Sequence, residues 1–126
     1  TDASHASDLE IRNDHPLRMH CRNVYSFSAT QVPVAGEQAL SLNALTKQSI
    51  DRVLLHQGSR YIVDTVGERL GIPTKTPFLA RDVGNTVSSS IPLMLSQGHC
   101  DNDERIAVCG FGVGLSLAAT VLTKGT

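Results

Sequence analysis

The spacing of apolar side chains is most regular after residue 50. Residues 51–55 (DRVLL) form a short run of leucine and β-branched residues, which predicts a buried strand. Residues 59–70 predict a helix, because apolar side chains recur there at every fourth position: Ile62, Val66 and Leu70. Gly71 follows as a natural C-cap, so the helix is expected to end there.

The remaining pattern predicts three strands and one more helix. Residues 76–80, 105–111 and 115–122 are the expected strands. Residues 86–97 are the expected helix, and Pro92 within it predicts a bend or a break. One face of this helix is expected to be apolar and to carry Val87, Ile91 and Leu95.

The first third of the chain has a weaker pattern. Apolar residues recur loosely over residues 23–44, which suggests a helix interrupted near Pro33. Residues 1–18 are polar, which predicts a flexible N-terminal segment. Strands that alternate with helices predict an α/β fold with a mixed or parallel sheet covered by helices. The last two strands, joined by glycines at 112–114, are expected to form an antiparallel hairpin.

Composition narrows the class of protein. The chain has 126 residues, which suits one compact domain, and its formal net charge of -1 gives no basic excess for nucleic acid. The longest apolar stretch, residues 106–122, is interrupted by glycines and falls short of a membrane span. Three cysteines, an odd count, without a secretory signal point to a reducing compartment, so a cytoplasmic protein is expected.

Three short motifs could carry chemistry. His56 ends a buried strand before a helix, where α/β folds place ligands, and its ring N–H could bind a developing oxyanion. Asn85 follows Gly84 and could offer its amide in the same way, although a plain helix N-cap is the commoner role of an asparagine at such a position. The glycine turn around Val113 could bring a backbone N–H to a ligand, or could be only a tight hairpin.

Taken together, these motifs resemble one family. They are His56-Gln57, Gly84-Asn85-Thr86 with Ser90-Ile91-Pro92-Leu93, and Phe111-Gly112-Val113-Gly114, with Met19–Phe27 as the opening segment. In order and spacing they are similar to the C-terminal half of the type III β-ketoacyl-acyl carrier protein synthases, in the thiolase superfamily. The resemblance makes residues 19–126 a C-terminal thiolase-like condensing-enzyme domain, one of two duplicated halves of an αβαβα sandwich.

The resemblance implies a decarboxylative Claisen condensation of an acyl thioester with a malonyl thioester. His56 and Asn85 would donate hydrogen bonds to the malonyl thioester oxygen, and Val113, beside Gly112, would lend a backbone N–H to the acyl-cysteine oxyanion. No metal or cofactor is implied, because coenzyme A or phosphopantetheine thioesters are the substrates. Four residues would contact the substrate or the carrier protein: Gln57, Ser59, Arg60 and Tyr61.

The sequence departs from the family pattern in two respects. None of Cys21, Cys100 and Cys109 matches the family's nucleophile, so a cysteine-bearing N-terminal half is the expected partner, in a homodimer or heterodimer. Cys109 is expected to be a small, buried core residue. The run 59–61 (SRY) stands where the family usually has asparagine, leucine and arginine. That difference suggests a specialised member of the family, of secondary metabolism rather than of fatty acid initiation.

Three other functions remain open from the sequence. A non-catalytic scaffold that supports a cysteine-bearing partner is the main alternative. A metal site would use adjacent pairs that lack the spacing of structural zinc ligands: His15, His20, Cys21, His99 and Cys100. A hydrolase is disfavoured, because the chain has no Gly-x-Ser-x-Gly motif.

Overall fold

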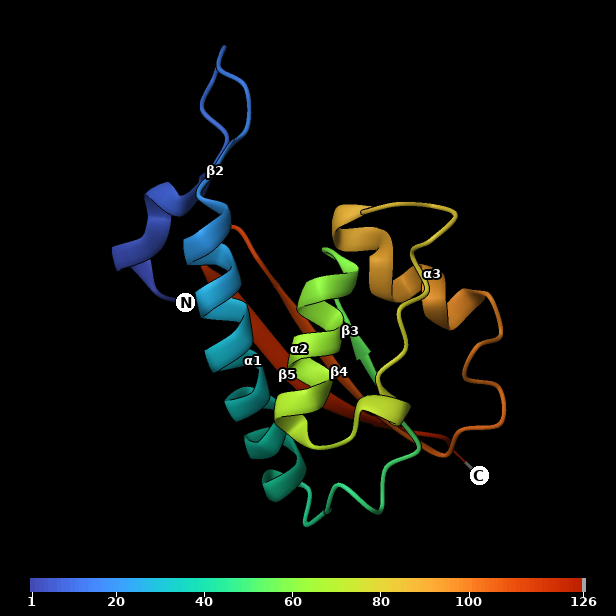
Figure 1. The fold of residues 1–126 in the computed structure, drawn as a ribbon. Helices are drawn as coiled ribbons and strands as arrows, with labels where there is room; N and C mark the ends of the chain where they lie inside the picture. The colour runs from blue at the N-terminus through green and yellow to red at the C-terminus, as the bar shows by residue number, and fades with distance from the viewer. Residues whose placement is uncertain (126) are drawn as a thin grey trace.

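A three-stranded mixed sheet organises the molecule (Figure 1). The computed structural model describes residues 1–125, with strands β3 (Arg52–Leu55), β4 (Arg105–Gly112) and β5 (Ser116–Thr123) in the order β3-β4-β5. β3 runs parallel to β4, with Leu55 opposite Cys109, and β4 runs antiparallel to β5. The α/β class and the C-terminal hairpin are therefore confirmed.

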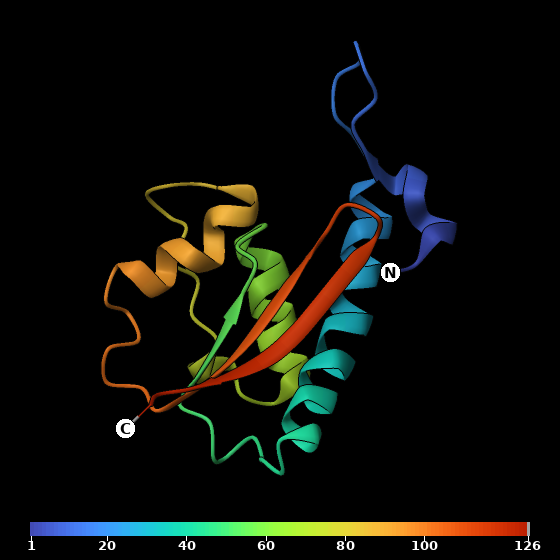
Figure 2. The same cartoon turned by 180° about the vertical axis from the view of Figure 1, so that it is seen from behind.

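Helices cover the two faces of the sheet unequally. The long helix α1 (Cys21–Leu42) and α2 (Arg60–Leu70) pack on one face, and the short α3 (Ser90–Ser96) lies on the other, near β3 (Figures 1 and 2). Successive strand residues point to opposite faces, so Val53 and Leu55 join the larger core, whereas Leu54 joins a smaller core with Met94 and Ile106. In Figure 2, no helix among residues 1–125 crosses the outer face of β5.

Pro33 does not interrupt α1, contrary to the sequence expectation. The helix continues through Pro33, which is buried. A proline lacks the N–H that would bond the carbonyl four residues earlier, here that of Ala29. Arg69, on the adjacent α2, donates to this carbonyl at 2.8 Å. A neighbouring helix therefore supplies the donor that the proline removes.

The predicted helix at 59–70 is confirmed, with both of its ends. Ser59 is the N-cap, and its hydroxyl accepts a hydrogen bond from the Ile62 N–H at 3.3 Å. Gly71 ends the helix in the left-handed conformation, with φ of 72°, which glycine adopts without steric cost. α2 thus begins directly after the turn that follows β3, and this turn carries His56.

The predicted strand at 76–80 is wrong. This segment follows a short 3-10 turn, η2 (Pro73–Lys75), and has no regular secondary structure. The buried side chain of Gln57 holds it instead. The Gln57 amide donates to the Pro77 carbonyl at 3.4 Å, and its oxygen accepts from the Leu79 N–H at 2.8 Å. A side chain therefore provides the hydrogen bonds that a neighbouring strand would have made.

The predicted helix at 86–97 is shorter and is oriented differently. A 3-10 turn, η3 (Val87–Ser89), precedes α3, and Pro92 is the third residue of α3, where no intrahelical partner for an N–H exists. The expected apolar face is right only in part: Ile91 packs against the smaller core, where Met94 is buried at 3%, but Val87 is 69% exposed.

Residues 1–18 contain regular structure. A 3-10 helix, η1 (Ala3–Asp8), leads into the short paired strands β1 (Leu9–Glu10) and β2 (Arg18–Met19), which project from the body of the molecule (Figure 1). Asp8 links this segment to α1, because its carboxylate accepts hydrogen bonds from Asn23 and His5. The expected flexibility of residues 1–18 stays a prediction. Among residues 1–125, no helix has the length and apolarity needed to cross a membrane.

Candidate active site

His56 lies where β3 ends, at the boundary between the sheet and the surface. Its backbone N–H extends the parallel ladder by donating to the Cys109 carbonyl at 3.0 Å. The half-buried ring meets Phe111 edge to face at 5.3 Å between centroids. Its Nδ1 lies 2.9 Å from the hydroxyl oxygen of Ser90, the first residue of α3. The ring is thus held by β4 on one side and by α3 on another.

The surroundings of His56 favour its neutral form. Burial lowers the pKa of His56 below its usual value, because the charged imidazolium loses hydration there. A hydrogen bond with the backbone of Val87 acts in the opposite direction but does not reverse the shift. A neutral imidazole carries one N–H and one lone pair, so it can donate a hydrogen bond without bringing a positive charge.

Asn85 lies at the entrance to α3, and its side chain is oriented by the chain itself. Its Oδ1 accepts a hydrogen bond from the Val87 N–H at 2.9 Å. The amide NH₂ group of this exposed residue has no hydrogen-bond acceptor among residues 1–125. Asn85 does not cap α3 directly, because η3 intervenes. The arrangement leaves two amide hydrogens free to donate outward.

Val87 connects the two candidate donors. Its backbone bonds the side chains of both Asn85 and His56. Val87 also has a φ of 54°, in the left-handed region, which is strongly disfavoured for a β-branched residue. Backbone strain of this kind concentrates at functional sites, where the surrounding structure maintains it. The geometry therefore brings His56 and Asn85 to one strained backbone position.

Gln57 lies beside His56 but points inward. It is 2% exposed, and its amide also donates to the Leu55 carbonyl at 3.0 Å, in addition to the bonds with residues 77 and 79. The structure thus gives Gln57 a role in holding the loop near the site. Contact of Gln57 with substrate or carrier stays a prediction.

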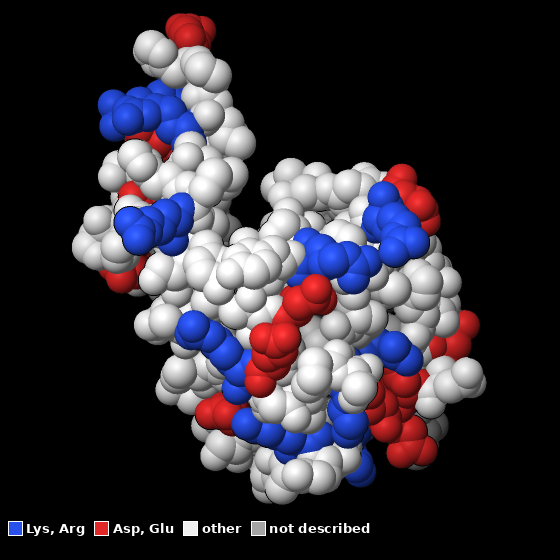
Figure 3. All heavy atoms as spheres, in the orientation of Figure 1, with Lys and Arg blue, Asp and Glu red and all other residues white. Residues whose placement is uncertain are grey.

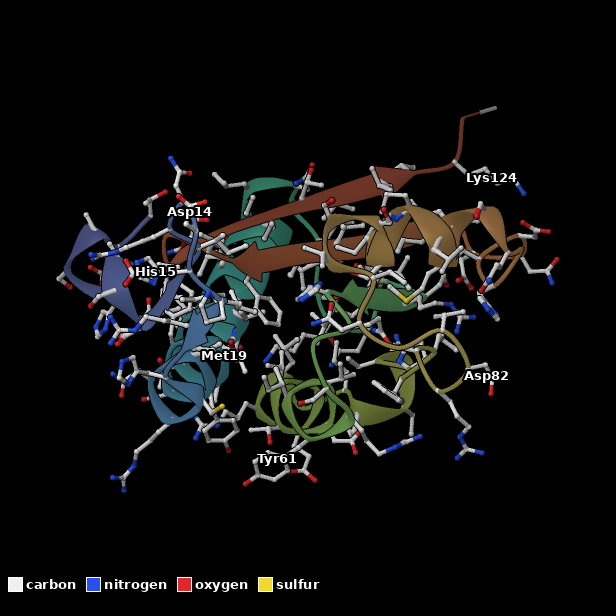
Figure 4. All side chains as sticks on the ribbon, turned by 90° about the horizontal axis from the view of Figure 1, so that it is seen from above. Asp14, His15, Met19, Tyr61, Asp82 and Lys124 are labelled. Carbon is white, nitrogen blue, oxygen red and sulfur yellow. The ribbon has the colours of Figure 1, made fainter. Side chains whose placement is uncertain are left out.

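The other three predicted binding residues lie on the first turn of α2. Ser59 caps the helix, whereas Arg60 places its guanidinium over the Phe78 ring at 4.6 Å. Tyr61 is 68% exposed and stacks on Tyr25 of α1 at 5.0 Å, and Figure 4 shows it pointing away from the body of the molecule. Arg60 and Tyr61 are thus accessible to a second molecule.

A surface groove begins at Arg60. It has a volume of about 510 Å³, and the loop that carries Asp82 in Figure 4 forms part of its wall. Its lining combines two guanidinium groups and apolar side chains with one carboxylate and two further polar side chains: Arg60, Arg81, Phe78, Leu79, Val83, Asp82, Gln97 and His99. Such a lining suits an elongated ligand that has both apolar and anionic parts.

The glycine hairpin lies beyond Phe111 on β4. Gly112 pairs with Ser116, and a side chain at position 112 would meet nothing within 4 Å, so the space beside it is open. Val113 is 58% exposed, and its carbonyl accepts the Ser116 hydroxyl at 2.7 Å, which fixes the turn. The oxyanion role of the Val113 N–H stays a prediction.

Among the described residues, none of the three cysteine thiols takes part in the hydrogen bonds of this site. Cys109 is buried in the larger core, 1% exposed, as the sequence indicated, and burial raises the pKa of its thiol to about 11. Cys100 is also buried, whereas Cys21 is exposed at the start of α1. Within residues 1–125, no three histidine, cysteine or acidic side chains come together as a metal site. Lysine, arginine and acidic side chains are interspersed across the face in Figure 3.

Sequence reasoning did not assign roles to three residues around His56. Ser90 and Phe111 belonged only to the family motifs, and Val87 was placed on an apolar helix face. The sequence offers one usable signal, the run Ser88-Ser89-Ser90, because three small residues within a predicted helix indicate close packing or a narrow pocket. The strained backbone of Val87 leaves no signature in a single sequence.

A parallel strand pair, a covering helix layer and a histidine and an asparagine at one edge define a thiolase-like condensing-enzyme half-domain. The chain belongs to the family of 3-oxoacyl-[acyl-carrier-protein] synthase III C-terminal domains, because residues 40–124 match its model. It is 44% identical to β-ketoacyl-[acyl-carrier-protein] synthase III of Thermosynechococcus vestitus and 40% identical to that of Synechocystis sp.. Each match covers 84% of this chain and 34% of the relative.

Solved structures show the same architecture. The β-ketoacyl-[acyl carrier protein] synthase III from Thermus thermophilus is 30% identical, with a TM-score of 0.88. That match covers 98% of this chain and 44% of the solved one. The priming β-ketosynthase of the R1128 polyketide biosynthetic pathway is 26% identical with a TM-score of 0.86, over 97% and 42% of the two chains. Measured against the curated relatives that it matches, the chain spans about a third of their length.

Proposed function

We propose that this chain is the C-terminal half of a condensing enzyme that joins an acyl thioester to a malonyl thioester. The cysteine that accepts the acyl group would lie on an N-terminal half. The observation that carries the proposal is that one short segment, residues 87–90, holds both side chains: the Val87 N–H donates to Asn85 Oδ1, and the Ser90 hydroxyl lies 2.9 Å from His56 Nδ1. Two hydrogen-bond donors held by one segment suit an oxygen that gains negative charge during the reaction.

In the proposed reaction, the malonyl thioester loses carbon dioxide, and the electrons of that bond form an enolate. His56 and Asn85 would donate to the thioester oxygen where this charge collects. The enolate carbon then attacks the acyl-cysteine carbonyl, and the cysteine leaves as thiolate when the tetrahedral intermediate collapses. Donors fixed in advance stabilise the transition state more than the ground state, which is how such groups accelerate a reaction.

The phosphopantetheine arm of the substrate would approach through the groove at Arg60 and past the exposed ring of Tyr61. A phosphopantetheine group is long, largely uncharged and anionic at one end, and this matches the mixed lining of the groove. Acyl carrier protein or coenzyme A would deliver it. Because residues 59–61 differ from the usual family residues, a specialised acyl substrate is the expected difference from fatty acid initiation. We expect the full enzyme to be a cytoplasmic dimer.

The test is a condensation assay with acyl-coenzyme A and malonyl carrier protein, with this chain assembled with its cysteine-bearing half. His56→Ala and Asn85→Ala should each lower kcat by about 10²–10³-fold, as loss of an oxyanion donor does. His15→Ala is the matched control, because His15 is an exposed histidine that does not line the groove at Arg60. Full activity in both site variants would instead favour the alternative, a non-catalytic subunit that supports a cysteine-bearing partner.

A further inference from the structure

Both tyrosines of this chain lie at the surface where α1 packs against α2. Tyr25 belongs to α1 and Tyr61 to α2, and 36 positions separate them in the sequence. Their rings are nearly parallel, with 18° between the ring planes and 5.0 Å between the centroids. The two hydroxyl oxygens lie 3.5 Å apart, so the rings approach each other more closely at their hydroxyl ends than at their centres.

This tyrosine pair is accessible from solvent. Tyr61 is 68% exposed and points away from the body of the molecule in Figure 4, whereas Tyr25 is half-buried. Both residues lie within helices, so the backbone keeps the two rings together. The sequence has no tryptophan, the other side chain that readily forms an aromatic radical. One-electron oxidation of the aromatic side chains would therefore concentrate at this pair.

We propose that Tyr25 and Tyr61 form an oxidative modification site, at which a dityrosine bond fastens α1 to α2. The oxidant would be a haem peroxidase supplied with hydrogen peroxide. Dityrosine forms between the carbons that flank the hydroxyl-bearing carbon of each ring, so contact between the hydroxyl ends is the geometry that coupling needs. Because the two rings are already held together, coupling within one molecule is favoured over coupling between molecules.

The chemistry balances with hydrogen peroxide as the electron acceptor. Each phenol gives one electron and one proton to the peroxidase, which leaves two tyrosyl radicals. A single carbon–carbon bond then joins the rings, and the hydrogens on the coupled carbons move to the two oxygens, which restores both aromatic rings. Overall the pair loses two electrons and two protons, and the peroxide becomes two molecules of water.

The bond would close a loop of the chain between residues 25 and 61. A covalent link across a loop of this length restricts the unfolded chain, so it should stabilise the packing of α1 against α2. The tyrosine pair shares no residue with the hydrogen bonds of His56 and Asn85. The modification site therefore does not depend on the proposed condensation reaction.

The test oxidises the protein in its native assembly, at low concentration, with a haem peroxidase and hydrogen peroxide. A Cys21→Ser background is used, because Cys21 is exposed one turn before Tyr25 and its thiol would reduce the tyrosyl radical. Trypsin should release residues 23–47 and 61–69 as separate peptides before oxidation. After oxidation, mass spectrometry should find these two peptides joined, with the loss of two hydrogens.

Two variants in the same background serve as controls. Tyr61→Phe should abolish the joined peptide, because phenylalanine has no phenol to oxidise. Tyr25→Phe combined with Val34→Tyr keeps one tyrosine on each helix but moves the one on α1 by about 13 Å along the helix axis. Val34 is 49% exposed, so the change is tolerated, and the product should fall by about tenfold or more.

The outcomes decide the proposal directly. A joined peptide in the Tyr25 and Tyr61 protein, lost in Tyr61→Phe and depleted in the displaced variant, supports it. Oxidation that gives only hydroxylated tyrosines or bonds between two copies would overturn it, as would equal yields in the displaced variant. Chemical denaturation is the second readout: the cross-linked protein should unfold at a higher denaturant concentration than before oxidation, and an unchanged midpoint would overturn the fastening of α1 to α2.

Discussion

His56 is held by groups that carry no charge. A hydroxyl, an aromatic edge and a backbone group surround the ring, contributed by Ser90, Phe111 and Val87. With desolvation as the largest influence, the pKa of His56 falls below its usual value. Burial therefore favours the neutral ring, in contrast to a histidine that is paired with a carboxylate.

The lowered pKa of His56 predicts how stability depends on pH. Between about pH 6.5, where an unfolded histidine titrates, and the lower pKa of the folded state, the unfolded chain binds a proton that the folded chain does not. The free energy of unfolding should therefore fall as the pH falls through this window. Denaturant titrations from about pH 7.5 to pH 5 measure it, and His56→Gln should flatten the slope whereas His99→Gln should not. Equal slopes in wild type and His56→Gln would contradict the burial effect.

The three cysteines should differ sharply in reactivity. Cys109 is buried with a pKa of about 11, so at pH 8 it remains a thiol, and the thiol form does not attack alkylating reagents. Cys21 is exposed on the first turn of α1. Iodoacetamide followed by peptide mass spectrometry should label Cys21 in the folded protein and Cys109 only after denaturation. Rapid labelling of Cys109 in the native state would rule out its core position.

At the scale of the elements, side chains replace backbone hydrogen-bond partners in two places. Gln57 holds the irregular segment 76–80 against β3, and Arg69 supplies the donor that Pro33 removes from α1. Sequence pattern predicted α2 well, because its cap, spacing and terminal glycine are all local. It failed at Pro33 and at 76–80, because each outcome depends on a side chain from a distant part of the sequence.

Gln57→Ala should lower the free energy of unfolding by about 2–3 kcal/mol, since it removes three hydrogen bonds and leaves buried partners unsatisfied. Chemical denaturation measures this loss. Gln97→Ala is the control, because Gln97 is exposed and its side chain bonds only His99 among the described residues; it should change stability by less than about 0.5 kcal/mol. Equal effects of the two changes would exclude the proposed clamp.

A double-mutant cycle tests the bond between Arg69 and Ala29. Arg69→Met should cost about 1 kcal/mol in the wild type, where Pro33 leaves the Ala29 carbonyl without its helical donor. Pro33→Ala restores that N–H, so in this background the cost of Arg69→Met should shrink. Urea denaturation of the four proteins gives the coupling energy, and a coupling of zero would show that the two effects are independent.

At the scale of the whole molecule, the sheet is covered unequally. α1 and α2 pack on one face, whereas exposed side chains line the other face of β5 at alternate positions: Ala118, Thr120 and Leu122 (Figure 2). Such a face suits a half-domain that packs against a second half. The motif order in the sequence indicated the half-domain; which face is left uncovered depends on the topology and became clear only from the structure.

The central claim is that this chain acts as one half of a two-half condensing enzyme. The most direct test is the intact mass of the native species isolated from its source, by native mass spectrometry. The account predicts a cysteine-bearing partner, or a chain about three times as long, in keeping with the third of each curated relative that this chain covers. A lone, stable monomer of 13.5 kDa would contradict it, because His56 and Asn85 would then have no acyl-cysteine to serve.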